Sequence, residues 1–160
     1  MPDPAMLSNF NFAVHIELSS LGGDEGLALG SRKGAFSEVQ GLEITLEPVS
    51  LREGGYNRGA RQLVGKTTNP PLILKRGLSL DPAFWTWVQR CIDGTFPLPD
   101  VSGTIRVLQA DSSAPDAGVW RFENGIVTKV KSADLNAGNA REVPLEELHI
   151  VHEGLSREAV

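Results

Sequence analysis

The sequence predicts a mainly β protein, an antiparallel β-barrel or sandwich with one flanking α-helix at about residues 82–92. Short segments with an apolar residue at every second position recur along the chain and are separated by glycine-rich turns, which is typical of strands. Only one segment has the apolar period of a helix. The length of 160 residues is typical of one domain, so we expect residues 1–160 to form a single domain with an extended arm or loop at about residues 52–70.

The first half of the chain is expected to contain most of the irregular structure. The alternation is clearest near the N-terminus, where every even-numbered residue from Phe10 to Leu18 is apolar. Leu21–Gly34 is glycine-rich and is expected to be an exposed loop. Pro48 cannot donate to a ladder, so its strand should lie at an edge or bend there. The strands expected in this half are Asn9–Leu18, Ala35–Gln40, Glu43–Leu51 and Pro71–Arg76.

Arg52–Pro70 has neither a helical nor a strand period, and it is polar and rich in glycine. We therefore expect an irregular loop. A loop near 20 residues is unusual inside a compact domain, and such loops are generally functional.

The second half contains the helix and further strands. Asp81-Pro82 is typical of a helix start, and Gly94 lies where a glycine stop belongs. The spacing predicts an apolar helix face formed by Phe84, Trp85, Val88, Cys91 and Ile92. One of the two helix tryptophans is expected in the core. A hairpin of Val101–Ala110 and Gly118–Lys131 and a last strand, Glu142–Glu153, complete the predicted sheet.

Composition excludes several classes of function. The net charge is −5 and the basic residues are scattered, so no specific nucleic-acid recognition is expected. A single cysteine, Cys91, excludes a disulfide framework within one chain. No apolar run approaches the ~20 residues that cross a bilayer, and the N-terminus lacks the pattern of a secretory signal. We therefore expect synthesis in the cytoplasm and no membrane anchoring.

Two motifs suggest chemistry, and both have simpler interpretations. Ala60–Thr67 fits a relaxed phosphate-loop pattern ending in Gly65-Lys66-Thr67, but no strand precedes it and Pro70 prevents a helix from following. His149 and His152 lie three residues apart on a predicted strand and so face opposite sides, where we expect them at the sheet surface rather than on one metal ion. No catalytic, cofactor-binding or metal-binding residue is predicted, and the chain is not expected to be an enzyme.

Several segments taken together resemble one family, the inner tube proteins of contractile phage tails and extracellular contractile injection systems. Their order and spacing span most of the chain. The segments are Phe36–Leu42, Leu51–Arg58, Leu72–Leu78, Phe84–Trp87, Asp134–Ala137 and Glu147–Leu155.

The resemblance implies a β-barrel subunit that forms hexameric rings, which stack into a rigid hollow tube inside a contractile sheath. It implies contacts with the sheath protein and with baseplate, spike and cap proteins, and a lumen that can hold cargo. It also implies an assembled phage tail or injection particle that can be released from the bacterium. Arg52–Pro70 is then an arm reaching an adjacent subunit in the same or the next ring.

The resemblance also suggests interface residues. On the arm, charged residues would form ion pairs between subunits and glycines would let the backbone bend; the set is Arg52, Glu53, Gly54, Gly55, Asn57, Arg58, Arg61, Gly65 and Lys66. Further interface candidates are Lys75, Arg76, Asp134 and Asn136. The candidate sheath contacts are Asp24, Glu25, Thr86, Gln89 and Arg90.

Three alternatives remain at this point. The first is a tube-initiating ring near the baseplate of the same machine. The second is a secreted hexameric carrier of effectors, similar to the ring protein of type VI secretion. The third, from another class, is a nucleotide-binding enzyme that uses Ala60–Thr67.

Overall fold

The computed structural model describes residues 11–19, 36–78, 82–94, 100–109, 115–134 and 144–158. The predicted loop Leu21–Gly34 and the expected helix cap Asp81 lie outside these residues. In chain order the elements are β1 (Asn11–Ser19), β2 (Glu38–Gln40), β3 (Thr45–Leu51), β4 (Arg61–Thr68), β5 (Leu72–Gly77), α1 (Pro82–Ile92), β6 (Asp100–Leu108), β7 (Gly118–Lys131), β8 (Leu145–Val151) and β9 (Gly154–Glu158).

The long strand β7 belongs to two sheets. Its first part pairs with β6 on one side and β9 on the other, and its last part, from Ile126, pairs with β8. The change occurs at Asn124, which has a positive φ of 52°, and at Gly125, where a Cβ would lie 2.7 Å from the carbonyl oxygen of Val101. Because only a residue without a side chain fits so close to β6, β7 can turn from one sheet to the other there.

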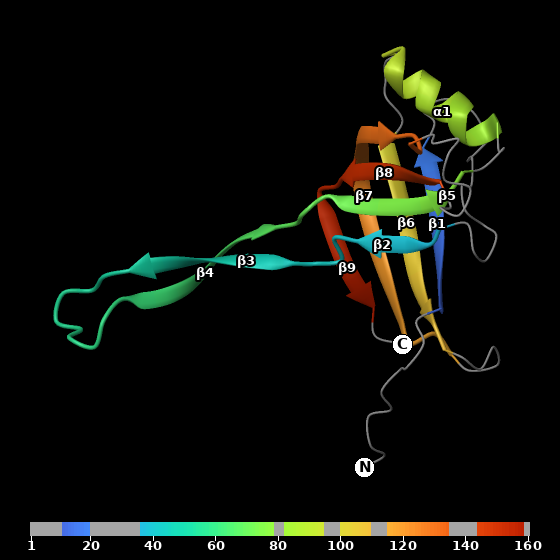
Figure 1. Cartoon of the computed structure of the whole chain (residues 1–160). Coiled ribbons are helices and arrows are strands. Elements are labelled where there is room, and N and C mark those ends of the chain that lie inside the picture. The colour runs from blue at the N-terminus through green and yellow to red at the C-terminus, as the bar shows by residue number, and fades with distance from the viewer. Residues whose placement is uncertain are drawn as a thin grey trace.

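All described strand pairs are antiparallel, and the path runs β1-β6-β7-β8-β5-β2. In Figure 1 the strands β2, β5 and β8 run across β1, β6 and the first part of β7, so the two parts of the sheet face each other. Within the described residues β1 and β2 do not pair, and the sheet is therefore sandwich-like rather than a closed barrel. The predicted mainly β class with one flanking helix is confirmed.

The core lies between these two layers. Residues at every second position point inward, as the burial of β5 and β8 shows. The core residues from the strands include Val14, Ile16, Leu72, Leu74, Ile105, Phe122, Leu148 and Ile150. Full burial of one such side chain stabilises the fold by about 1.5–3 kcal/mol, so this cluster is the main source of stability.

Helix α1 covers one end of the two layers (Figure 1). It begins at Pro82 and is followed by Gly94 with φ +63°, so the predicted bounds and glycine stop are confirmed. Its buried residues are Phe84, Trp87 and Val88. The predicted apolar face is wrong for Ile92, which is 70% exposed because it lies in the last turn, and Trp87 rather than Trp85 is the core tryptophan.

Two strands differ from the sequence prediction. Arg52–Pro70 is not an irregular loop, because Arg61–Thr68 forms β4 opposite β3. The predicted last strand, Glu142–Glu153, is shorter, and a separate strand β9 follows it. Both strands were missed because burial does not impose a regular apolar alternation on them. The bend expected at Pro48 is confirmed by a register shift between Leu46 and Pro48.

Replacing Gly41 with alanine is expected to destabilise the protein. Gly41 has φ +89°, and a Cβ there would lie 2.2 Å from the carbonyl oxygen of Pro71. We expect a loss of at least ~1–2 kcal/mol from the backbone conformation alone, and a fall in melting temperature of several degrees. Gly54→Ala is the matched control, since no atom lies within 4 Å of its Cβ position. Equal melting temperatures for the two variants in a thermal scan would contradict this account.

Candidate assembly surface

Strands β3 and β4 and the loop between them project from the rest of the molecule as one long hairpin (Figure 1). These residues, Thr45–Thr68, are termed the arm. Its two strands pair only with each other among the described strands, and no arm residue belongs to the buried core. Every residue of β3 is exposed, and so is every residue of β4 except the half-buried Gly65. Such a hairpin is marginally stable by itself in water.

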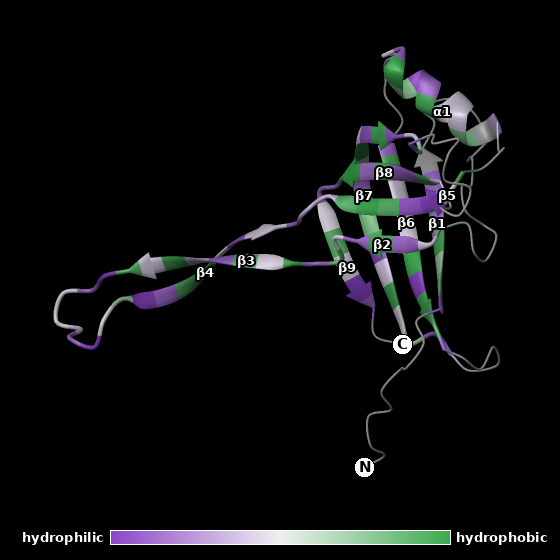
Figure 2. Cartoon of the chain, viewed as in Figure 1, coloured by the Kyte–Doolittle hydropathy of each residue, from purple (hydrophilic) through white to green (hydrophobic). Residues whose placement is uncertain are grey.

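The arm carries large apolar side chains that nothing in the described chain covers. Val64 is 81% exposed, and Val49 and Leu63 form a cross-strand pair with about half of each side chain exposed. Figure 2 shows apolar positions on both strands of the arm. The other exposed apolar residues of the arm are Leu46, Leu51 and Tyr56. An exposed apolar surface of this kind is typical of a protein–protein contact.

The backbone of the arm is irregular near its middle. The register shifts between Leu46 and Pro48, and opposite this bulge a Cβ on Gly65 would lie 2.4 Å from the carbonyl oxygen of Glu47. Gly65 therefore allows the two strands to approach closely. The bulge also reverses the face on which the following side chains lie. Apolar residues therefore appear on both faces of the arm.

The tip of the arm is basic and internally ordered. Arg61 Nε lies 3.1 Å from a carboxylate oxygen of Glu53, and its guanidinium lies 5.3 Å from the centre of the Tyr56 ring. Within the described residues Arg52 and Arg58 form no ion pair. Their guanidinium groups are exposed and available to carboxylates of another molecule.

The further interface candidates fall in different places. Arg76 is buried, and its Nε donates to Glu146 Oε2 at 2.8 Å while its guanidinium lies 3.6 Å from the centre of the Phe84 ring. Arg76 thus links β5, β8 and α1 inside the subunit, and its guanidinium does not lie on the exposed surface where the predicted contact would place it. Lys75 pairs with Glu38, and Lys131 with Asp134, both at the surface at 3.1 Å. Asn136 lies outside the described residues.

Three of the candidate sheath contacts lie together on the outward face of α1. Thr86, Gln89 and Arg90 line an open hollow of about 550 Å³ beside Trp85, which is 37% exposed. Thr86 Oγ1 donates to the carbonyl oxygen of Pro82, and Gln89 Nε2 to Asp93 Oδ1, each at 2.8 Å. The other two candidates, Asp24 and Glu25, lie outside the described residues.

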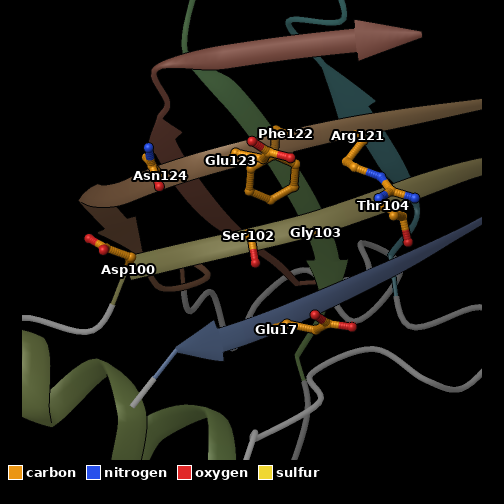
Figure 3. A pocket seen from close by; sticks show the side chains of 9 residues that line it. All are labelled: Glu17, Asp100, Ser102, Gly103, Thr104, Arg121, Phe122, Glu123 and Asn124. Atoms are coloured by element: carbon orange, nitrogen blue, oxygen red, sulfur yellow. The ribbon is translucent and has the colours of Figure 1, made fainter. Parts of the chain in front are cut away.

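A second hollow, of about 450 Å³, lies on the polar face of β1, β6 and β7 (Figure 3). Around it Glu17 accepts a hydrogen bond from His15 at 3.1 Å, and Arg121 pairs with Glu158 at 3.3 Å. The lining residues are Glu17, Asp100, Ser102, Gly103, Thr104, Arg121, Phe122, Glu123 and Asn124. Most of these side chains are exposed or half-buried, so the hollow is a solvated polar surface rather than an enclosed reaction site.

The phosphate-loop pattern lies in an extended strand. Residues 61–67 of the Ala60–Thr67 motif belong to β4, which is not the loop before a helix that binds phosphate. The described residues bring no three metal-ligating side chains together, and none of their helices is long and apolar enough to span a membrane.

Sequence reasoning missed the apolar component of the arm. The predicted residues there are charged, glycine or asparagine, whereas the most exposed large apolar side chains of the arm are Val64, Leu46 and Val49. The adjacent pair Leu63-Val64 was a usable signal, because two large apolar residues in an otherwise polar segment need an explanation. The pairing with β3 that places Val49 beside Leu63 could not be seen without β4.

Residues 8–156 match the family described as T4-like virus tail tube protein gp19. A search of curated proteins gives no match. Among solved structures, a chain of the anti-feeding prophage (AFP) baseplate is similar with a TM-score of 0.74 at 21% identity, covering 99% of this chain and 97% of that one. A chain of the PVC sheath/tube terminator, from an extracellular contractile injection system, gives 0.70 at 16%, covering 98% and 97%. A crystal structure of an Hcp protein gives 0.56 at 13%, covering 92% of each chain. At these identities the similarity shows a shared fold.

Proposed function

The chain belongs to the T4-like virus tail tube protein gp19 family and is a structural tube subunit, and from that premise we propose that its arm joins copies of the chain into hexameric rings. The rings stack into a hollow conduit inside a sheath. One observation carries this proposal: the arm exposes apolar side chains on both faces, and none of its residues belongs to the core that the described residues form. Such a segment is stabilised when a second copy covers it.

The charges of the arm support a contact between two different surfaces. Arg52 and Arg58 are unpaired within the described residues, so both can bind carboxylates of the receiving surface. An arm that projects from one side of the subunit and docks elsewhere on the next copy forms a heterologous contact, which closes into a ring or continues as a helical stack.

The outward face of α1 is proposed as the contact with the sheath. Its hollow is open and lined by Thr86, Gln89 and Arg90 around the partly exposed Trp85. A small, open contact of this kind suits a partner that must release the tube when the sheath shortens. In this proposal the subunit is made in the cytoplasm, joins baseplate, spike and cap proteins, and leaves the bacterium as part of the particle. The lumen is available to cargo.

The proposal is tested by imaging the purified protein in negative stain and measuring its mass in solution. We expect rings or stacked tubes with a central channel. A protein that stays strictly monomeric at every concentration, both alone and with a preformed baseplate, would contradict the proposal.

A point variant tests the arm in the same assay. Val64→Asp is expected to reduce the assembled fraction at least tenfold, since a carboxylate would replace the most exposed large apolar side chain of the arm. Ile92→Asp is the matched control, because Ile92 is similarly exposed, at 70%, but lies on α1. If both variants assemble equally well, the arm is not the contact.

A further inference from the structure

The chain has three histidines, and one of them is buried where the arm joins the body. His152 lies between β8 and β9 and is only 7% exposed. Its ring centre lies 6.1 Å from that of Phe122 on β7. Leu72 pairs with Ile150, so continuing the register places Pro70, in the connection from β4 to β5, against His152. The imidazole thus packs between the core and Asn69–Pro71, the segment that joins the arm to the rest of the molecule and is termed the arm root.

The polar atoms of this contact are poorly satisfied. Among the described residues neither ring nitrogen of His152 makes a hydrogen bond of good geometry, although the backbone of Gly154 and Pro70 lies close enough to interact with the ring, and the side-chain oxygen of Asn69 is buried without a partner as well. A buried polar group without a good partner destabilises the fold, and such a group in a native protein needs an explanation. Burial lowers the pKa of His152, and the nearby backbone of Gly154 and Pro70 offsets this only in part.

No described carboxylate is placed to stabilise a charged imidazole. Glu153, the next residue, accepts a hydrogen bond from Asn124 Nδ2 at 2.9 Å, and Glu123 on β7 is exposed. On β9, Arg157 has its guanidinium 5.8 Å from the centre of the Trp120 ring. Asn69–Pro71 contains no titratable side chain. A proton on His152 would therefore be a buried positive charge without a counter-ion among the described residues.

We propose that His152 is a proton-sensitive contact that holds the root of the arm at neutral pH and releases it in acid. The neutral ring packs Asn69–Pro71 against Phe122, whereas the protonated ring needs water and favours a state in which this segment has moved away. Because the pKa in the closed state lies below the unfolded value near 6.5, the stabilisation is fully present above pH 6.5. It is lost as the pH falls toward the lowered pKa.

The consequence for assembly rests on the proposed function, because an arm with a loosened root binds a second copy less well. The contact itself is tested on the dissolved chain by hydrogen exchange at pH 7.5 and pH 5, corrected for the intrinsic effect of pH. We expect the protection of amides 36–44 and of the Asn69 and Leu72 amides, which flank two prolines without an amide hydrogen, to fall in acid by roughly tenfold for each unit by which the pKa of His152 lies below 6.5. An NMR titration of the wild type should give a midpoint for His152 below 6.5.

Two variants complete the test. His152→Gln cannot titrate, so its arm root should lose no additional protection between pH 7.5 and pH 5. His149→Gln is the matched control, because His149 lies three residues away and contacts Glu147 at 3.5 Å on the other face, and it should keep the wild-type response. A midpoint for His152 at or above 6.5, or an equal acid response in His152→Gln, would overturn the inference. Wild-type protein that forms no rings would count against the proposed function and leave this result unaffected.

Discussion

A chain in which a two-residue Asn-Gly turn replaces Thr45–Thr68 is expected to fold as a monomer and to form no rings or tubes. Thr45 and Thr68 are paired at the base of the arm, so a short hairpin turn can join the residues on either side. Among the described strands the two that are removed pair only with each other, and no residue of the described core is lost. The melting temperature of the body should therefore change by no more than a few degrees.

Mass in solution and negative-stain images decide this prediction. We expect an assembling wild type and an excised chain that remains monomeric at every concentration, with circular dichroism still showing a folded β protein. An excised chain that forms tubes would assign the contact to another surface. An unfolded excised chain would show that the arm stabilises the body, contrary to its separation from the core.

The second large effect is expected at the buried ion pair. Glu146→Ala leaves the guanidinium of Arg76 buried with no carboxylate, and breaking such a pair costs about 3–5 kcal/mol. For a chain of this size the melting temperature should fall by about 6–20 °C. The cost is large because Arg76 is the group through which β5 and β8 contact Phe84 of α1.

Two further variants separate charge from packing. Removing both charges in Arg76→Met/Glu146→Leu should cost less than Glu146→Ala, since no unpaired charge stays buried. Asp134→Ala breaks the exposed pair with Lys131 and should cost less than about 1 kcal/mol. Thermal unfolding of all three variants is the measurement. A Glu146→Ala protein as stable as Asp134→Ala would show that Arg76 reaches solvent.

The elements that the sequence predicts well are those whose pattern burial enforces. Helix α1 has a proline at its first position and a glycine stop, and the inward residues of β1, β5 and β8 alternate because one side of each strand faces the core. Strand β4 is exposed on both faces, so neither face is required to be apolar and no alternation appears. β4 forms because it pairs with β3, and the apolar pattern of one segment does not reveal which other segment it pairs with.

The candidate site is predictable only in part, for a similar reason. The location of the arm follows from the resemblance and from an unusually long polar segment. Its apolar contact surface requires the pairing of Val49 with Leu63. Arg76 resembles any surface cation beside Lys75 until Glu146, 70 residues further along the chain, is placed next to it. The buried position of His152, expected at the sheet surface, likewise depends on how β7 and the arm root pack around it.

The strand pairing has a consequence for the order in which the chain folds. β3 and β4 are neighbours in the sequence, joined by residues 52–60, so the arm hairpin can form transiently within microseconds of leaving the ribosome. β1, by contrast, pairs with β6, and Asn11 meets Leu108, so the body cannot complete its sheet until most of the chain has been synthesised. During that interval the apolar side chains of the arm are exposed, in a hairpin that is only marginally stable, without a folded body to position them. Premature association of nascent chains is therefore the misfolding route to expect when this protein is overproduced, and a lower expression level, with fewer nascent chains present at once, should increase its soluble yield.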